Sequence, residues 1–152
     1  MVEVRLSSLQ DTRQLASFIA RFPLAGKVMG LSGPLGSGKT TFTRELVAAL
    51  GSKDQVSSPT FVLCHEYQGQ GIWIEHWDLY RLDRLPFELL EETNSLRIVE
   101  WAEKAPEFFE QLDLSLQFDF LSTQRDAGSE QRIVKIKGEL QEKLKKEFAA
   151  WL

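Results

Sequence analysis

A glycine-rich segment at residues 33–41 constrains the fold of this chain more than any other feature. It reads Gly-Pro-Leu-Gly-Ser-Gly-Lys-Thr-Thr and satisfies the Gly-x-x-x-x-Gly-Lys-Thr pattern of a phosphate-binding loop, or P-loop. The preceding residues 27–32 are short, apolar and partly β-branched, as in a buried strand. Phe42, Leu46 and Leu50 follow at helical spacing. The order predicts a strand, a loop and a helix, which is the setting a P-loop requires.

The chemistry expected of this loop is the binding of a nucleoside triphosphate together with Mg2+. Glycines allow successive backbone amides to point inward around phosphates, and the start of the next helix adds positive dipole character. Lys39 would reach the β- and γ-phosphates, and the Thr40 hydroxyl would ligate Mg2+. No Asn-Lys-x-Asp sequence is present to read guanine, and Arg81 stands where the second switch of a GTPase has glycine. ATP is therefore favoured over GTP.

The remaining runs predict one α/β domain over residues 1–152, a P-loop NTPase domain with a mixed central β-sheet flanked by helices. The nucleotide would lie at the carboxyl ends of the central strands. Turn residues at 69–71 predict an antiparallel hairpin, and 122–130 form the polar loop of a second one. We expect strands at 2–6, 27–32, 62–67, 72–77, 96–99, 112–121 and 132–137. We expect helices at 8–22, from the P-loop to Leu50 with Gly51 as its cap, and at 85–92, 104–111 and 139–151.

Composition and charge narrow the classes of protein further. The formal net charge of −4 disfavours wide contact with a phosphate backbone, so any nucleic acid would be reached through a partner. No apolar run approaches the roughly 20 residues of a membrane helix, and the N-terminus lacks a signal or transit pattern. We expect a cytoplasmic protein with no membrane contact. Cys64 is the single cysteine, so no disulfide within the chain is possible, and we expect a buried, inert thiol.

Turnover of a bound nucleotide would need a carboxylate at the end of an apolar strand, to hold Mg2+ or to orient water. Asp78 and Glu100 both fit, since each ends such a run. The sequence leaves open which of them has which role. His65 and His76 lack the neighbouring ligands of a zinc site, and we expect them to be structural or hydrogen-bonding residues.

Four segments in this order resemble the TsaE family of bacterial P-loop ATPases. They are 33–41, Val-Ser-Ser-Pro-Thr-Phe at 56–61, His-Trp-Asp-Leu-Tyr-Arg-Leu at 76–82, and Val-Glu-Trp at 99–101. The resemblance covers roughly residues 5–137. It implies a small ATPase that supports the N6-threonylcarbamoyladenosine (t6A) modification of tRNA. Such a protein works with the TsaD and TsaB subunits, which carry out the transfer, and reaches tRNA mainly through that complex.

The resemblance also implies roles for individual residues. Thr60 lies in the first switch, where it would sense the γ-phosphate or position water, and Asp78 lies in the second switch and is the leading residue for orienting water. Glu100 matches the carboxylate near the metal, with Trp101 as the aromatic residue beside it. The N-terminal segment with Thr12 is also similar. The phosphate-loop positions are Gly33, Gly36, Ser37, Gly38, Lys39, Thr40 and Thr41, with Thr40 and Glu100 at the metal.

Two departures from the family pattern are visible. Pro34 stands where Asp or Asn is common and removes one amide donor, and the segment between Leu82 and Val99 is shorter than usual. Two other functions are compatible with the motifs. One is a nucleotide-gated binding module whose hydrolysis is incidental. The other is a small-molecule P-loop kinase, for which Arg125 and Arg132 flank the only long polar loop but no helical lid pattern is present.

Overall fold

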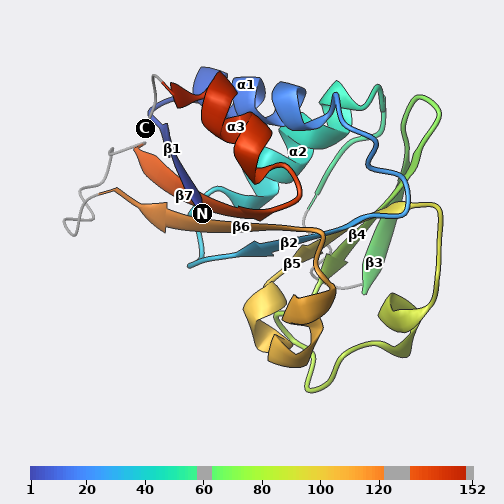
Figure 1. Cartoon of the computed structure of the whole chain (residues 1–152). Helices are drawn as coiled ribbons and strands as arrows, with labels where there is room; N and C mark the ends of the chain where they lie inside the picture. Colours follow the sequence, from blue (N-terminus) through green and yellow to red (C-terminus); the bar gives the residue numbers. More distant parts are fainter. Residues whose placement is uncertain (58–62, 122–130, 150–152) are drawn as a thin grey trace.

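The computed structural model describes residues 1–57, 63–121 and 131–149. Its centre is a seven-stranded sheet in the order β1-β7-β6-β2-β5-β4-β3 (Figure 1). The strands are β1 (Val2–Leu6), β2 (Val28–Ser32), β3 (Cys64–Gln68), β4 (Trp73–Asp78), β5 (Leu96–Glu100), β6 (Leu114–Phe120) and β7 (Arg132–Gly138). The sheet is mixed, as predicted, because β6, β2, β5 and β4 pair in parallel while both edges are antiparallel.

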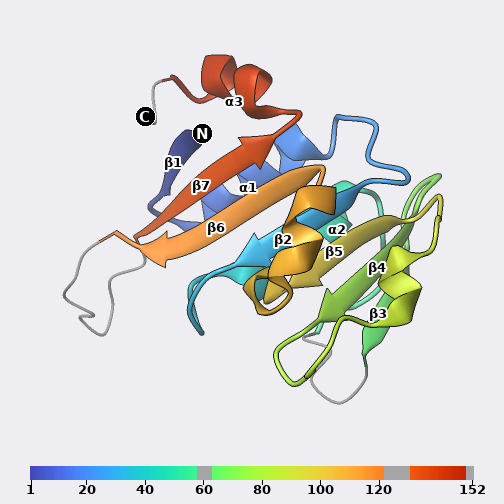
Figure 2. The same cartoon turned by 60° about the horizontal axis from the view of Figure 1, so that its bottom comes forward.

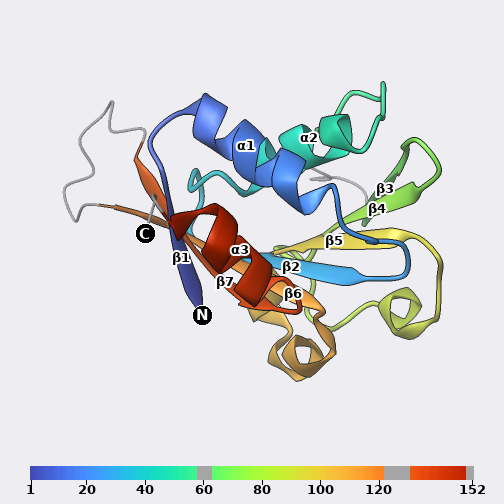
Figure 3. The same cartoon turned by 45° about the horizontal axis from the view of Figure 1, so that its top comes forward.

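Helices cover one face of this sheet. They are α1 (Leu9–Ile19), α2 (Lys39–Ala49) and α3 (Gln141–Glu147), and they lie together in front of the strands in Figure 3. Leu15, Phe42 and Leu46 are fully buried against the sheet, which explains the apolar stripes of α1 and α2. Ser8 caps α1 by accepting a hydrogen bond from the Asp11 amide, so the helix begins where its capping residue stands.

Short 3₁₀ helices cover the opposite face, as Figure 2 shows. They are η1 (Phe87–Leu90), η2 (Ala102–Lys104) and η3 (Pro106–Gln111). A second, smaller apolar cluster forms beneath them, in which Trp77 and Val99 from the sheet pack with Leu89, Ala105 and Phe108. Both faces of the central strands are therefore covered, and every residue of β5 is buried.

The short helices predicted at 85–92 and 104–111 form as 3₁₀ helices with narrower bounds. The helix at 87–90 is a single 3₁₀ turn, and the buried guanidinium of Arg97 holds it by donating to the carbonyls of Glu88, Leu89 and Glu91. The Glu88 carbonyl also accepts from the Glu91 amide that closes the turn. The second segment is split in two, since Pro106 has no amide to continue η2.

The other expected elements are confirmed with shifted ends. Both hairpins form, with β3 against β4 and β6 against β7, and Gly51 follows α2 with a φ of 87°. The last helix is shorter than the predicted 139–151 within the described residues. Ser58, Pro59, Thr60, Arg125 and the loop at 122–130 lie outside the described residues. Among the described helices, none combines the length and apolar character needed to cross a membrane.

Candidate functional site

The P-loop connects the end of β2 to the start of α2. Gly33 has a φ of 133°, and a side chain there would collide with the carbonyl oxygen of Phe118 on the neighbouring strand β6. Gly38 is the N-cap of α2 with a φ of 109°, and no side chain caps this helix end within the described residues. The first amides of a helix carry partial positive charge. The loop thus brings an uncapped helix N-terminus to the carboxyl end of the sheet.

Lys39 is held inside this loop. Its side chain is buried, and its ammonium group donates to the carbonyls of Gly33 at 2.5 Å and Pro34 at 3.0 Å. The same ammonium lies 4.1 Å from the ring centre of Trp101. Burial lowers the pKa of Lys39 from its ordinary value, while the negative charge of Glu103 most strongly opposes the shift. The loop carbonyls and the Trp101 ring therefore hold the Lys39 ammonium group at the place where it would bind an anionic ligand.

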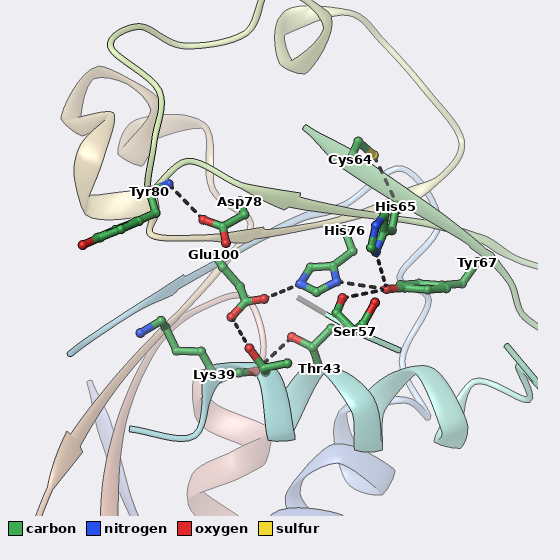
Figure 4. A network of polar contacts seen from close by, with 11 residues as sticks. Lys39, Thr43, Ser57, Cys64, His65, Tyr67, His76, Asp78, Tyr80 and Glu100 are labelled. Carbon is green, nitrogen blue, oxygen red and sulfur yellow. Dashed lines mark hydrogen bonds and ion pairs between the residues drawn. The ribbon is translucent and has the colours of Figure 1, made fainter. Parts of the chain in front are cut away.

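Glu100 meets the P-loop from the adjacent parallel strand. Because β2 and β5 run in parallel, the end of β5 lies beside the loop, and the Thr40 hydroxyl donates to Glu100 Oε1 at 3.0 Å (Figure 4). The other carboxylate oxygen contacts His76 Nε2, and Glu100 is only 2% exposed. Asp78 lies opposite Glu100 in the register of β4 and β5. Its Oδ1 accepts a hydrogen bond from the Tyr80 amide at 2.9 Å.

One cavity of about 580 Å³ adjoins most of the predicted site residues. Ser37 is fully buried, and its hydroxyl oxygen has no hydrogen-bond partner among the described residues. Gly33 does not line this cavity, but its carbonyl oxygen accepts a hydrogen bond from Lys39, which does. The lining includes the predicted residues Thr12, Gly36, Ser37, Gly38, Lys39, Thr40, Thr41, Asp78, Glu100 and Trp101.

The structure adds residues to this site that sequence reasoning had not placed there. Glu103, in η2, accepts a hydrogen bond from the Gly33 amide at 2.9 Å. The Tyr80 ring packs against Trp101 with ring centres 4.7 Å apart and the ring planes tilted by 43°. Arg132, considered only as part of a kinase lid, donates to the Gly36 carbonyl at 3.3 Å. The one feature of the sequence that could have indicated Glu103 was its position just after Glu100 and Trp101.

Trp101 has an unusual backbone for its residue type. Its φ of 59° is the only positive value among the described non-glycine residues. Large side chains rarely adopt this conformation, and such positions cluster at functional sites. The turn directs β5 into η2, which places the Trp101 ring over Lys39 and Glu103 beside Gly33.

The two histidines and the cysteine lie along the neighbouring hairpin. His76 is fully buried and contacts Glu100 and the hydroxyl of Tyr67, and His65 also contacts that hydroxyl. The hydrogen-bonding role predicted for both histidines is confirmed. Cys64, predicted to be buried, is only partly so, because β3 is an edge strand. Burial and nearby carboxylates raise the pKa of its thiol to about 12, which keeps it protonated at neutral pH.

These features define an α/β protein with a P-loop, two carboxylates on adjacent strands and a cavity above the loop. The family model for "Threonylcarbamoyl adenosine biosynthesis protein TsaE" matches residues 6–133. The chain therefore belongs to the TsaE family of threonylcarbamoyladenosine biosynthesis proteins.

Individual relatives agree with this assignment. The TsaE protein of Aquifex aeolicus is 41% identical over 105 residues, covering 67% of this chain and 77% of the relative. That of Nostoc is 31% identical over 140 residues, covering 86% and 83%. The match to the Haemophilus influenzae protein, at 36% identity, covers 63% of this chain and 65% of the relative, so about a third of that relative lies outside the match.

A solved structure confirms the predicted fold class. The crystal structure of YdiB from Bacillus subtilis matches with a TM-score of 0.68 and 28% sequence identity. The match covers 98% of this chain and 94% of YdiB. The mixed sheet flanked by helices is thus shared across nearly the whole chain.

Proposed function

We propose that this protein is a Mg2+-dependent ATPase that supports t6A modification of tRNA. The observation that carries the proposal is the meeting of Lys39, Thr40 and Glu100 at the P-loop. Lys39 supplies a cation for phosphate, and Thr40 and Glu100 supply oxygen atoms for a metal. Membership of the TsaE family indicates t6A biosynthesis as the pathway.

The side chains and backbone amides of the loop fit a triphosphate. Ser37 has a buried hydroxyl with no partner in the part of the chain that the structure describes, and a phosphate oxygen would satisfy it. The uncapped N-terminus of α2 offers amides and a positive dipole end to the same ligand. The Lys39 ammonium would exchange the carbonyls of Gly33 and Pro34 for β- and γ-phosphate oxygens. Pro34 lacks an amide, but its carbonyl holds this lysine in the free protein.

Thr40 Oγ1 and Glu100 Oε1 fit a small hard cation. Their oxygens lie 3.0 Å apart, and Mg2+ in nucleotide sites takes few protein ligands, with phosphates and waters completing its shell. When bound, Mg2+ would neutralise charge that develops on the transferring phosphoryl group. Glu100 is the better metal residue because it contacts Thr40, which assigns the orientation of water to Asp78, with Thr60 as a second group.

The side of the cavity next to β1 and α1 suits a nucleoside. Leu6, Leu9 and Thr12 line it from β1 and α1, and Phe118 lines it from β6. Apolar walls with a few polar groups are typical of base-binding sites. We assign the base and ribose of ATP to this side, and Thr12 as one of their contacts. Trp101 would contact the phosphate side, where its ring covers Lys39.

The expected partners are the TsaD and TsaB subunits. The net charge of −4 supports contact with tRNA through these partners rather than directly. Arg81 lies at the cavity, but a further positive charge supplied in trans could accelerate hydrolysis by about 10³-fold or more. We therefore propose slow turnover by the isolated cytoplasmic protein and stimulation in the full complex.

The test is Mg-ATP binding and turnover by wild type and Lys39→Met, which keeps the stem of the side chain and removes its charge. We expect wild type to bind and Lys39→Met to lose at least about tenfold in affinity, since a charge-assisted contact to phosphate is lost. Lys53→Met, at an exposed lysine far from the cavity lining, is the control and should behave as wild type. Absence of Mg-ATP binding by folded wild type would overturn the proposal.

Partner dependence and product identity are measured in the same system. Phosphate release should rise only when TsaB, TsaD and tRNA are all added. A phosphorylated metabolite in place of free phosphate would instead identify a kinase. If Asp78→Asn binds ATP without turnover yet sustains repeated rounds of modification, the protein is a nucleotide-gated binding module.

A further inference from the structure

A chain of hydrogen bonds runs from the P-loop through three strands, as Figure 4 shows. The Thr40 hydroxyl donates to one oxygen of Glu100, and the other oxygen contacts His76 Nε2. On the far side of the imidazole, His76 Nδ1 lies 3.2 Å from the Tyr67 hydroxyl. That hydroxyl lies 3.3 Å from the carbonyl oxygen of Ser57. The chain therefore crosses from α2 to β5, β4 and β3 and ends at the backbone before residues 58–62.

Both middle members of this chain are inside the protein. His76 is fully buried and Tyr67 is 4% exposed, so water does not replace their hydrogen bonds. Burial raises the pKa of the Tyr67 hydroxyl, which keeps it a donor at neutral pH. Buried polar groups of this kind are costly unless each is paired. His76 contacts the Glu100 carboxylate and Tyr67 contacts His76, and two buried polar side chains arranged in series behind one site carboxylate need a reason beyond packing.

The protons in the chain can be assigned from the groups themselves. An ionised carboxylate only accepts, so His76 Nε2 must carry a hydrogen to bond Glu100. In the neutral imidazole, Nδ1 is then an acceptor, and the Tyr67 hydroxyl donates to it. The same hydroxyl has a single hydrogen and also faces the Ser57 carbonyl. It can satisfy only one of these two acceptors at a time.

We propose that His76 and Tyr67 are positioning residues that orient Glu100 for a metal-bound nucleotide and tie its position to the backbone at Ser57. This inference rests on the proposed function, in which Glu100 is a metal residue. His76 fixes the oxygen of Glu100 that does not face Thr40, and this leaves Oε1 directed at the P-loop. Tyr67 fixes the tautomer of His76 when it donates to Nδ1, and the same hydrogen can instead bond the Ser57 carbonyl. The two contacts therefore compete for one donor, while His65 lies 3.4 Å from the same hydroxyl.

The first test is the dependence of nucleotide affinity on Mg2+. In His76→Leu, we expect the ratio of ATP affinity with and without Mg2+ to fall by about tenfold or more, as for lost outer partners of metal ligands. Tyr67→Phe should lower it by about threefold, because it removes one hydrogen bond a step further away. His76→Gln retains a side-chain amide that can donate to Glu100 and should recover most of the loss. A merely structural role would weaken both affinities equally and leave the ratio unchanged.

Thr43→Val is the matched control, since it also removes a buried hydroxyl. That hydroxyl donates to the Lys39 carbonyl within α2, outside the chain of contacts from Thr40 to Ser57. Its Mg2+ ratio should equal that of wild type even if stability falls. A wild-type ratio in Tyr67→Phe and in folded His76 variants would overturn the positioning role. Failure of wild type to bind Mg-ATP would instead overturn the proposed function.

The second test needs no nucleotide and remains decisive if His76→Leu does not fold. The chain has two histidines, so the imidazole nitrogens of a ¹⁵N-labelled sample are readily assigned. We expect His76 to carry its hydrogen on Nε2, and Tyr67→Phe to shift the Nδ1 resonance through loss of its donor. A His76 ring with hydrogen on Nδ1 alone could not donate to Glu100 and would overturn the inference.

Discussion

At the scale of single residues, the charge of Lys39 is controlled by its neighbours. Three carboxylates, Glu103, Glu100 and Asp78, favour the charged lysine against the cost of burial. Glu100 and Asp78 have proposed roles with metal and water. Glu103 differs because it is exposed and contacts the loop through the Gly33 amide. Its charge therefore stabilises the lysine in the free protein and repels an arriving triphosphate.

Glu103→Gln should consequently tighten ATP binding. Glutamine retains an oxygen that can accept from Gly33 and removes the negative charge, so we expect about a threefold lower Kd at low salt. The effect should fade at high salt, because exposed charges are screened over about 10 Å at moderate ionic strength. Calorimetric titrations at low and high salt would measure it. Glu107→Gln, at an exposed glutamate of η3, is the control, and weaker binding by Glu103→Gln at both salts would contradict the prediction.

At the scale of elements, β5 organises both faces of the sheet. Its last residue, Glu100, faces the P-loop, while Arg97 near its start holds η1 through backbone carbonyls and pairs with Glu75 at 3.3 Å. Residues at the two ends of β5 therefore contact different parts of the molecule. Arg97 stabilises the 3₁₀ turn at 87–90 on the face opposite α1, α2 and α3, and Glu100 belongs to the site.

Arg97→Met should reduce stability without changing the site. Loss of the guanidinium removes the charged partner of Glu75, which keeps only the Trp77 indole as a donor among the described residues. It also removes one donor from each of three carbonyls, so we expect a decrease of about 3 kcal/mol in the free energy of unfolding. Urea unfolding would measure this, and the Kd for ATP of the folded variant should stay within about twofold of wild type. Arg5→Met, on the exposed face of β1, should change stability by less than about 0.5 kcal/mol. Equal losses in both variants would contradict this account of η1.

At the scale of the whole molecule, the proposed site draws on elements from most of the chain. The cavity is lined from β1 and α1, the P-loop, the ends of β4 and β5, and the β6–β7 hairpin. A ligand that contacts all of these elements binds the folded state only. Its binding energy is therefore added to the stability of the whole domain.

Mg-ATP should accordingly stabilise the protein against heat. At a concentration of about 100 times Kd, the gain is about 2.7 kcal/mol, which corresponds to roughly 5 to 10 °C in Tm for a domain of this size. Differential scanning calorimetry with and without Mg-ATP would measure the shift. At the same concentration, a tenfold weaker affinity would reduce the gain in Lys39→Met to about 1.4 kcal/mol, and a larger loss of affinity would reduce it further. A nucleotide that binds wild type but leaves its Tm unchanged would argue for a surface site rather than this cavity.

Residue patterns in the sequence were sufficient to predict the features that depend on interactions between residues close together in the chain. The strand, loop and helix around residues 33–41, the stripes of α1 and α2, and the two hairpins follow from residue spacing and turn chemistry, and the structure confirms this arrangement. The short helices expected at 85–92 and 104–111 also form, as 3₁₀ helices with narrower bounds. Arg97 lies outside the turn at 87–90 that it holds, so periodicity within that turn does not reveal its contacts.

The sequence by itself determined the P-loop, its lysine and threonine, and the two strand-ending carboxylates, because these depend on residue type and spacing. Only the tertiary structure decided that Glu100 contacts Thr40, that His76 and Tyr67 stand behind Glu100, and that Glu103 contacts Gly33. These contacts depend on β5 pairing beside β2 and on the left-handed turn at Trp101. Strand order and such turns are set by packing across the whole sheet, which no local pattern encodes.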